Sequence, residues 1–322
     1  MKKILLATTM LASTVGFAAA DVAVTGSARM GLVHQRTGVV AAAPAVAATP
    51  FNLATLAVAG NPGKLETQFS SRVRIVFTGT GTTDSGLTFG ASMRADQSGG
   101  NSTDTQTTNG SSTAYISGAF GKLTFGDVAG GAGDYLVGQI SYVGFTSLGS
   151  TNEIGFLPGT ATAARYDYTS GNLSFSLGVS QPGAASKAAS ANKNSIALKY
   201  ATGAYSGAIS YETVQGNNLV SFKGSATFGQ ATVTLKAAKA KFATVAALPT
   251  ATKGKTEFGV SLDYKVMPAL KLTAYFTDHK DTNLISKGIG ASYDLGGGAS
   301  VIGGVVKYGA DTIGDVGVTM SF

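Results

Sequence analysis

The strongest constraint on the fold is an alternation of apolar residues with small or polar residues at a period of two. From 173 to 179 the chain reads LSFSLGV, and from 257 to 266 it reads EFGVSLDYKV. Successive side chains of a β-strand point to opposite faces of the sheet, so each segment predicts a strand with one apolar and one polar face. The pattern therefore predicts an all-β fold whose sheet separates two different environments.

Sixteen segments follow this pattern, and most are near the roughly ten residues with which a tilted strand crosses a bilayer. They cover residues 22–34, 65–79, 86–96, 112–119, 121–127, 163–169, 172–180, 194–201, 205–213, 219–228, 231–241, 255–266, 270–279, 286–295, 299–308 and 314–322. The connections alternate between short turns and longer loops, which is typical of outer-membrane barrels. We expect a sixteen-stranded antiparallel transmembrane β-barrel.

A soluble β-sandwich is the alternative fold for such a pattern, but it would need neither sixteen strands nor alternating loop lengths. Charged residues make up only 13% of the chain, against about a quarter in an ordinary soluble domain. The low charge argues against a typical soluble enzyme and favours a protein that exposes apolar surface to lipid. No basic patch with interleaved aromatic residues indicates nucleic-acid binding.

The start of the chain has the form of a secretory signal peptide. Two lysines precede a mostly apolar stretch over 4–17, and three alanines then offer a cleavage site. We predict that the signal peptide covers residues 1–20 and that residues 21–322 form a single barrel domain.

A second apolar stretch, over 39–60, is the one candidate for a membrane helix in the mature chain. It contains Pro44 and Pro50, and a proline inside a helix costs about 3 kcal/mol. We therefore expect a long loop rich in Ala and Pro at this position.

The final predicted strand carries apolar residues at every second position up to the last residue. Val316, Val318, Met320 and Phe322 share one face. A closing strand that ends in Phe resembles the assembly signal of outer-membrane barrels. Phe322 is therefore predicted to be recognised by the barrel-assembly machinery.

Several features together resemble the general-diffusion porins of Gram-negative bacteria, especially the alphaproteobacterial branch. They are the sixteen strands, a long third loop over 128–162, the terminal Phe, and the phrases FGKLTFGD at 120–127 and ARYDY at 164–168. The resemblance implies an outer-membrane channel for passive diffusion of small hydrophilic solutes and ions. It also implies a third loop that folds into the barrel, a homotrimer, contact with outer-membrane lipid and lipopolysaccharide, and basic wall residues opposite carboxylates of that loop.

Strand parity can be used to test for such a basic wall. The apolar neighbours of five arginines would face lipid, which places the arginines on the water side: Arg29, Arg72, Arg74, Arg94 and Arg165. The simpler explanation is that charges avoid lipid, where an arginine costs roughly 2–4 kcal/mol. That cost does not explain why arginines gather on early strands while later strands use lysine. A narrow polar constriction would favour arginine, which stays charged and presents a rigid fork.

The third loop contains no Lys or Arg, and its carboxylates are Asp134 and Glu153. Opposite the arginines they would create a transverse field across the pore, and we expect Asp134 to lie at the narrowest point. Small outward residues on early strands, Ala28 and Ala91, would let barrels approach closely in a trimer. Because basic residues outnumber acidic ones among the inward positions, we expect a weak anion preference.

No catalytic or metal-binding pattern is evident. The chain has no cysteine, and His34 and His279 share no spacing with a catalytic or ligating partner. We therefore expect neither enzymatic activity nor a cofactor. Two alternatives stay open: a substrate-selective porin with an inward aromatic track, for which Tyr275 is the clear candidate, and a plugged structural or adhesive barrel.

Overall fold

The computed structural model describes residues 21–37, 64–98, 107–128, 131–155, 157, 162–180, 193–214, 217–241, 254–280 and 283–322. The signal peptide predicted at 1–20 and the Ala- and Pro-rich loop predicted over 39–60 lie outside these residues. Both therefore stay predictions.

Sixteen strands run through the described part of the chain, and all neighbouring pairs are antiparallel. They are β1 (Asp21–Thr37), β2 (Lys64–Thr82), β3 (Thr88–Ser98), β4 (Thr107–Gly118), β5 (Gly121–Val128), β6 (Thr162–Ser170), β7 (Leu173–Val179), β8 (Lys193–Ala201), β9 (Tyr205–Val214), β10 (Asn217–Phe228), β11 (Ala231–Lys241), β12 (Thr256–Met267), β13 (Leu270–His279), β14 (Leu284–Gly296), β15 (Ala299–Tyr308) and β16 (Asp311–Ser321). Two short helices, α1 (Gly131–Leu136) and η2 (Ser147–Ser150), lie between β5 and β6.

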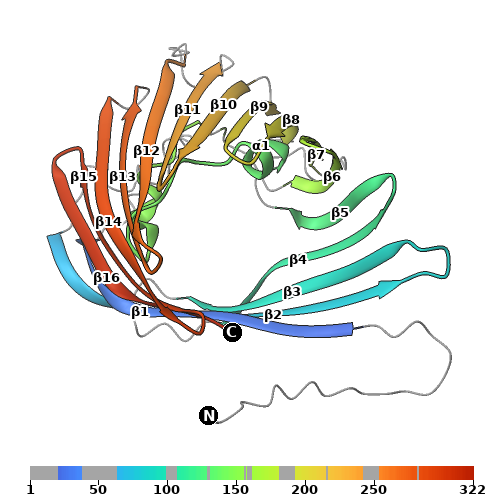
Figure 1. The fold of residues 1–322 in the computed structure, drawn as a ribbon, viewed down its shortest axis with the longest axis horizontal. Helices are drawn as coiled ribbons and strands as arrows, with labels where there is room; N and C mark the ends of the chain where they lie inside the picture. The colour runs from blue at the N-terminus through green and yellow to red at the C-terminus, as the bar shows by residue number, and fades with distance from the viewer. Residues whose placement is uncertain are drawn as a thin grey trace, which may run out of the picture.

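The sheet closes on itself because β1 pairs with both β2 and β16 (Figure 1). The predicted sixteen-stranded antiparallel barrel is thus confirmed. At the seam the last residue completes the ladder: Gly26 N donates to Phe322 O at 2.6 Å, and Phe322 N donates to Gly26 O at 3.0 Å. A Cβ on Gly26 would lie 2.4 Å from the Phe322 ring, so a larger residue there would have to displace the ring.

The two faces of the wall differ as the alternation predicts. Outward side chains are apolar and exposed, for example Phe69 at 71% and Ile289 at 63%. Inward positions carry small polar residues such as Ser176, Thr277 and Ser286, which are fully buried. Within the described residues, no helix has the length and apolar character needed to cross a membrane.

Two of the connections expected to be longer loops, 214–218 and 309–313, are only two residues long. The ladder continues to Asn217↔Val214 and to Tyr308↔Asp311, so residues 215–216 and 309–310 alone join the strands. The expected regular alternation of long and short connections is therefore wrong at these two places. Cross-strand hydrogen bonding extends each strand beyond the point where its apolar alternation stops.

The third loop, between β5 and β6, lies inside the barrel (Figure 1). Its helix α1 packs against β7, β8 and β9, and its later residues contact β10 to β16. The loop thus covers the inner wall of β7–β16. The inner wall of β1–β6, which the loop touches through Arg29 and Arg165, lines the lumen.

Candidate functional site

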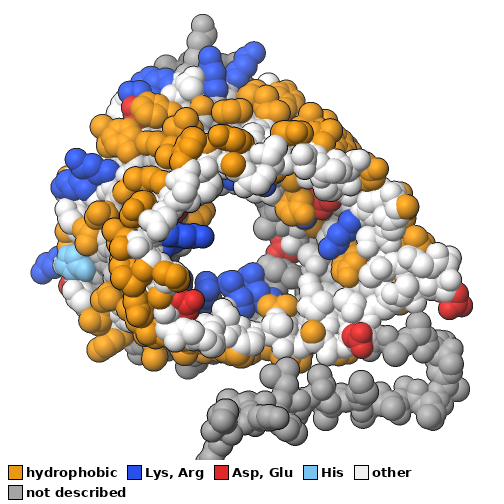
Figure 2. All heavy atoms as spheres, viewed as in Figure 1, with side chains coloured by type: hydrophobic (Ala, Val, Ile, Leu, Met, Phe, Trp, Pro, Cys, Tyr) orange, Lys and Arg blue, Asp and Glu red, His pale blue; other side chains and the backbone are white. Residues whose placement is uncertain are grey.

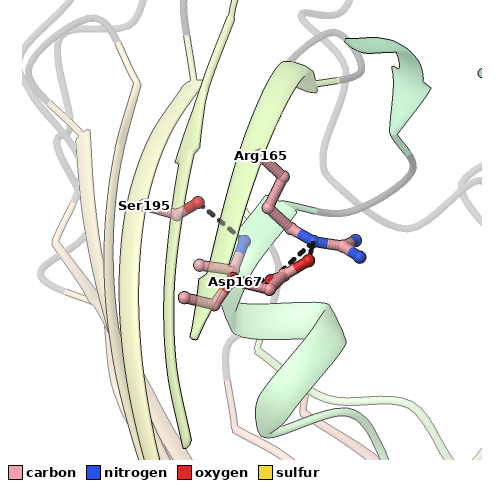
Figure 3. Close-up of polar contacts among 5 residues, drawn as sticks. Arg165, Asp167 and Ser195 are labelled. Atoms are coloured by element: carbon pink, nitrogen blue, oxygen red, sulfur yellow. Dashed lines mark hydrogen bonds and ion pairs between the residues drawn. The ribbon is translucent and has the colours of Figure 1, made fainter. Parts of the chain in front are cut away.

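The first turn of the third loop rests on the wall through α1. Ala132 N donates to Ser195 Oγ on β8 at 2.9 Å (Figure 3), and Ala132 and Leu136 pack with Ala197. A Cβ on Gly133 would lie only 1.8 Å from Glu212 Oε1 on β9. The helix therefore approaches the wall as closely as its backbone allows.

The middle of the loop crosses the wall over an apolar cluster. Ile140, Val143 and Leu148 are buried together with Tyr275, Val306 and Tyr308 of β13 and β15. Beside this cluster, Ser141 N donates to Ser261 Oγ at 3.1 Å, and Ser141 Oγ donates to Asp263 Oδ2. Apolar burial and hydrogen bonds to β12 hold this pass of the loop against the wall.

The tip of the loop is fastened to β16 by a single carboxylate. Asp315 accepts hydrogen bonds from Phe145 N at 3.1 Å, Thr146 N at 2.8 Å and Thr146 Oγ1 at 2.6 Å. Gly144 precedes them with a φ of +84°, and a Cβ there would lie 2.2 Å from Asp315 Oδ1. Arg29 on β1 reaches the same turn, with Nη1 3.5 Å from Phe145 O.

The returning half of the loop is anchored as well. Thr151 shares a hydrogen bond with Tyr275, and Gly155 N donates to Glu257 Oε2 at 3.0 Å. Leu157 is buried among Val214, Leu219, Ala238 and Ala240. Contacts along both passes make the loop a fixed inner layer of the barrel.

Four arginines come together on the uncovered wall of β1–β3. Arg29 and Arg72 are direct cross-strand partners. Arg74 Nε and Arg94 Nε lie 3.0 Å and 2.9 Å from Asp96 Oδ1. In the described residues neither Arg29 nor Arg72 has an ion pair within 4.0 Å, and the other three guanidinium groups repel Arg72. We call these four residues the arginine cluster.

The fifth predicted arginine, Arg165, lies on β6 and has its own carboxylate. Its Nε is 3.0 Å from Asp167 Oδ2 (Figure 3). Its guanidinium carbon lies 3.7 Å from the ring centroid of Tyr135 on α1, a stacked cation–π geometry. Arg165 therefore sits against the start of the third loop, apart from the arginine cluster.

The two carboxylates of the loop have basic or hydroxyl partners on their own side of the pore. Asp134 Oδ2 is 3.8 Å from Lys193 Nζ, which is also 2.6 Å from Glu212 Oε2. Glu153 Oε1 accepts from Tyr142 at 2.5 Å. Burial, with the Glu153 contact second, raises the pKa of Tyr142, so its hydroxyl stays protonated. The loop acids thus lie near groups that offset their charge.

An open passage runs along the barrel axis, with Lys and Arg side chains around it (Figure 2). Over residues 7–312 the chain matches the family described as Gram-negative porin. The protein belongs to this family. Its sixteen-stranded barrel is an outer-membrane channel, and the family points to a channel and not to an enzyme.

This porin is also similar to individual proteins. It is 33% identical over 292 residues to the porin of Rhodobacter capsulatus, covering 79% of this chain and 93% of that protein. A porin structure refined at 1.8 Å resolution superposes with a TM-score of 0.69 and 26% identity, covering 94% of this chain and all of that one. A mutant of the Rh. blastica porin superposes with a TM-score of 0.72 at 21% identity and the same coverage, a likeness of fold.

Some residues that position the porin's loop were not recognised in the sequence. The alternation along their strands places Asp315 and Tyr308 on the inner face of the barrel. Nothing in the sequence shows, however, that the third loop reaches β15 and β16. Tyr275, the candidate for an aromatic track, does face inward, but the loop buries it to 6% exposure, so it does not line the passage. His279 likewise contacts the loop, with Nε2 3.2 Å from Thr151 O.

Proposed function

We propose that the constriction of this porin lies between the arginine cluster and the tip of the third loop. The observation that carries the proposal is the placement of Arg29, which sits within the cluster and also reaches Phe145 O at the tip. The bound loop tip and the clustered guanidinium groups would set the size limit for small hydrophilic solutes and ions. Arg165, Asp134 and Glu153 line the neighbouring part of the same narrow region.

We further propose that the constriction prefers anions. Four arginines against two carboxylates, Asp96 and the Asp315 that attracts Arg29, leave a local charge of +2 (4 − 2). The loop acids would compensate little of it, because Asp134 lies beside Lys193 and Glu153 is engaged by Tyr142. Inside a narrow pore this charge is screened less than on an open surface.

Neutralising Arg72 and Arg74 together tests both proposals. The double variant R72Q/R74Q lowers the local charge from +2 to 0, while Arg94 still holds Asp96. In a KCl gradient its reversal potential should shift toward cation preference, and its single-channel conductance should change. The control is K265Q/K271Q, which removes two inward cations that face each other directly across β12 and β13. An equal shift in both variants would place the selectivity in the total charge of the lumen and not in the arginine cluster.

A homotrimer is proposed for this porin as well. In support, a shallow hollow over β1–β5 is lined on the lipid side by both large and small side chains, including Val22, Phe77, Ala91, Ala114 and Phe125. A second barrel could fill it closely. Crosslinking in mild detergent should trap trimers of the wild type, and A91F/A114F should reduce them. Trimers of undiminished yield in that variant would place the interface elsewhere.

The remaining proposals concern processing and partners. We propose that residues 1–20 are removed as a signal peptide, that Phe322 is read by the barrel-assembly machinery, and that the protein has no enzymatic activity or cofactor. Lipopolysaccharide is the expected lipid neighbour. N-terminal sequencing of the protein from outer membranes should begin at Asp21, and any other start would contradict the proposed cleavage site.

A further inference from the structure

Two tyrosine rings inside the barrel each carry a cation of the wall on one face. Lys122 Nζ on β5 lies 3.9 Å from the ring centroid of Tyr115 on β4. The Arg165 guanidinium carbon on β6 lies 3.7 Å from the ring centroid of Tyr135 on α1. A cation over the face of an aromatic ring is attracted by the electrons of the ring. Both cations are therefore held in position by an aromatic neighbour.

The strand register places the two pairs beside each other. Tyr115 faces Thr124 across β4 and β5, and Thr124 faces Arg165 across β5 and β6, so these three residues lie in one row. Lys122 is two residues from Thr124 and shares its inner face, whereas Phe125 on the other face is 54% exposed on the outside. Lys122 and Arg165 are thus diagonal neighbours on adjacent strands, about 7–8 Å apart. Both side chains can reach one anionic group between them.

Both cations keep hydrogen-bond donors that the described part of the chain does not use. Within that part, the hydrogen bonds of Arg165 come from Nε alone, which lies 3.0 Å from each oxygen of Asp167. Figure 3 shows the two Nη atoms of Arg165 directed away from Asp167. Lys122 is exposed, and no carboxylate of the described residues lies within 4.0 Å of its Nζ. A fork of N–H groups and an ammonium are therefore both available to a solute.

The carboxylate beside the two cations offsets half of their charge. Asp167 is the cross-strand partner of Lys122 and is bonded to Arg165. Asp134, on α1, has a cation of its own, because Lys193 Nζ lies 3.8 Å from its Oδ2. Two cations against Asp167 leave a local charge of +1 (2 − 1). One carboxylate of a solute is enough to neutralise this charge.

We propose that Lys122 and Arg165 form a binding site for the carboxylate of small organic acids that pass through the pore. The planar guanidinium fork matches the two oxygens of a carboxylate, and the Lys122 ammonium supplies a further donor. The rings of Tyr115 and Tyr135 hold these donors in place. The site is separate from the arginine cluster on β1–β3 and goes beyond the proposed constriction, because it selects an anion by its shape as well as by its charge.

Block of the KCl current by gluconate in planar bilayers tests this proposal, with sorbitol as the neutral compound of the same chain length. Gluconate bound at the site should lower the conductance of the wild type in a saturable way, whereas the effect of sorbitol should not saturate. Loss of one exposed cation should raise the half-blocking concentration of gluconate about five-fold, equivalent to about 1 kcal/mol. We expect this rise in K122Q, and K122R should restore the wild-type value.

A second variant and a control separate shape from charge. R165K keeps the positive charge but removes the planar fork, so it should also raise the half-blocking concentration about five-fold. The control K199Q removes an inward lysine of β8 whose cross-strand partners are Ser174 and Ala208, neither of them aromatic. K199Q should keep the wild-type half-blocking concentration.

Equal half-blocking concentrations in the wild type, K122Q and R165K would overturn the proposal. A rise in K199Q as large as that in K122Q would also overturn it, since block would then follow the total charge of the lumen. Loss of block in R72Q/R74Q together with normal block in K122Q would assign the acid to the arginine cluster instead. An unchanged reversal potential in R72Q/R74Q would count against the proposed constriction alone, so the two failures are distinguishable.

Discussion

Removing the carboxylate of Asp315 should release the tip of the third loop. In D315A, two backbone amides and the Thr146 hydroxyl lose their acceptor, and an unsatisfied buried group costs about 1–3 kcal/mol. Part of this cost is recovered because the freed tip meets water in the lumen. We therefore expect docking of the tip to weaken by about 3 kcal/mol, or roughly 100-fold in the ratio of released to docked loop.

Single-channel recording in planar bilayers measures this release directly. The D315A channel should switch between conductance levels far more often than the wild type, because a free tip moves in the passage. D315N keeps one carbonyl acceptor and should give an intermediate frequency. T146V loses the hydroxyl bond to Asp315 and the bond that Thr146 Oγ1 accepts from Leu148 N at 3.3 Å. Loss of the Asp315 bond alone should change the docking ratio by about five-fold, or 1 kcal/mol.

The barrel itself should survive these substitutions, since the hydrogen bonds of Asp315 go to the loop and not to the strand ladder. Unchanged β-sheet circular dichroism and heat-resistant migration on gels are the controls. A D315A channel with wild-type conductance and a wild-type frequency of switching between conductance levels would refute the reasoning. It would mean that the apolar cluster around Ile140 and Val143 holds the tip without help from Asp315.

Three further substitutions test other contacts. G133A places a Cβ at the position 1.8 Å from Glu212 Oε1. The clash should push α1 away from the wall, so protease should cut the third loop faster than in the wild type. The control G207A has open space around the added Cβ and should be cut at the wild-type rate. Y142F removes the hydrogen-bond donor to Glu153, so the negative charge of Glu153 is offset less and the reversal potential should shift slightly toward cation preference. The control Y135F keeps the aromatic ring under Arg165 and should leave the reversal potential unchanged. Equal shifts in the two variants would contradict the argument. F322A loses the ring that lies on Gly26 and should lower the yield of refolded, heat-resistant barrel well below that of S321A; equal yields would show that the ring is dispensable.

The strands and their faces could be predicted from the sequence because a sheet between lipid and water imposes its own period. The same parity predicted that Arg29, Arg72, Arg74 and Arg94 face inward, and their side chains do form one cluster. Strand ends were less predictable. At Val214 and Tyr308, hydrogen bonding to the next strand continues where the apolar alternation has stopped.

The partners of the third loop could not be predicted, because they depend on contacts between distant parts of the chain. Thr146 and Asp315 are 169 residues apart, and parity shows only that Asp315 faces inward. Tyr275 illustrates the same limit, since parity gives its direction but not the loop that covers it. For Asp134, the absence of basic residues within the loop suggested the arginine wall as its partner, whereas Lys193, on the wall beneath, lies 3.8 Å away.

The seam between β1 and β16 has a consequence for the order of biogenesis. Asp315 stands directly across from Val33 in the β1–β16 ladder, and Arg29 on β1 reaches the same loop tip that Asp315 holds. An open sheet, with β1 and β16 apart, has the two halves of this docking site on opposite edges. The passage can therefore acquire its final width only when the last strand joins the first. Closure of the seam therefore decides the pore width as well as the integrity of the wall, because both groups that hold the loop tip come from the two strands that meet there.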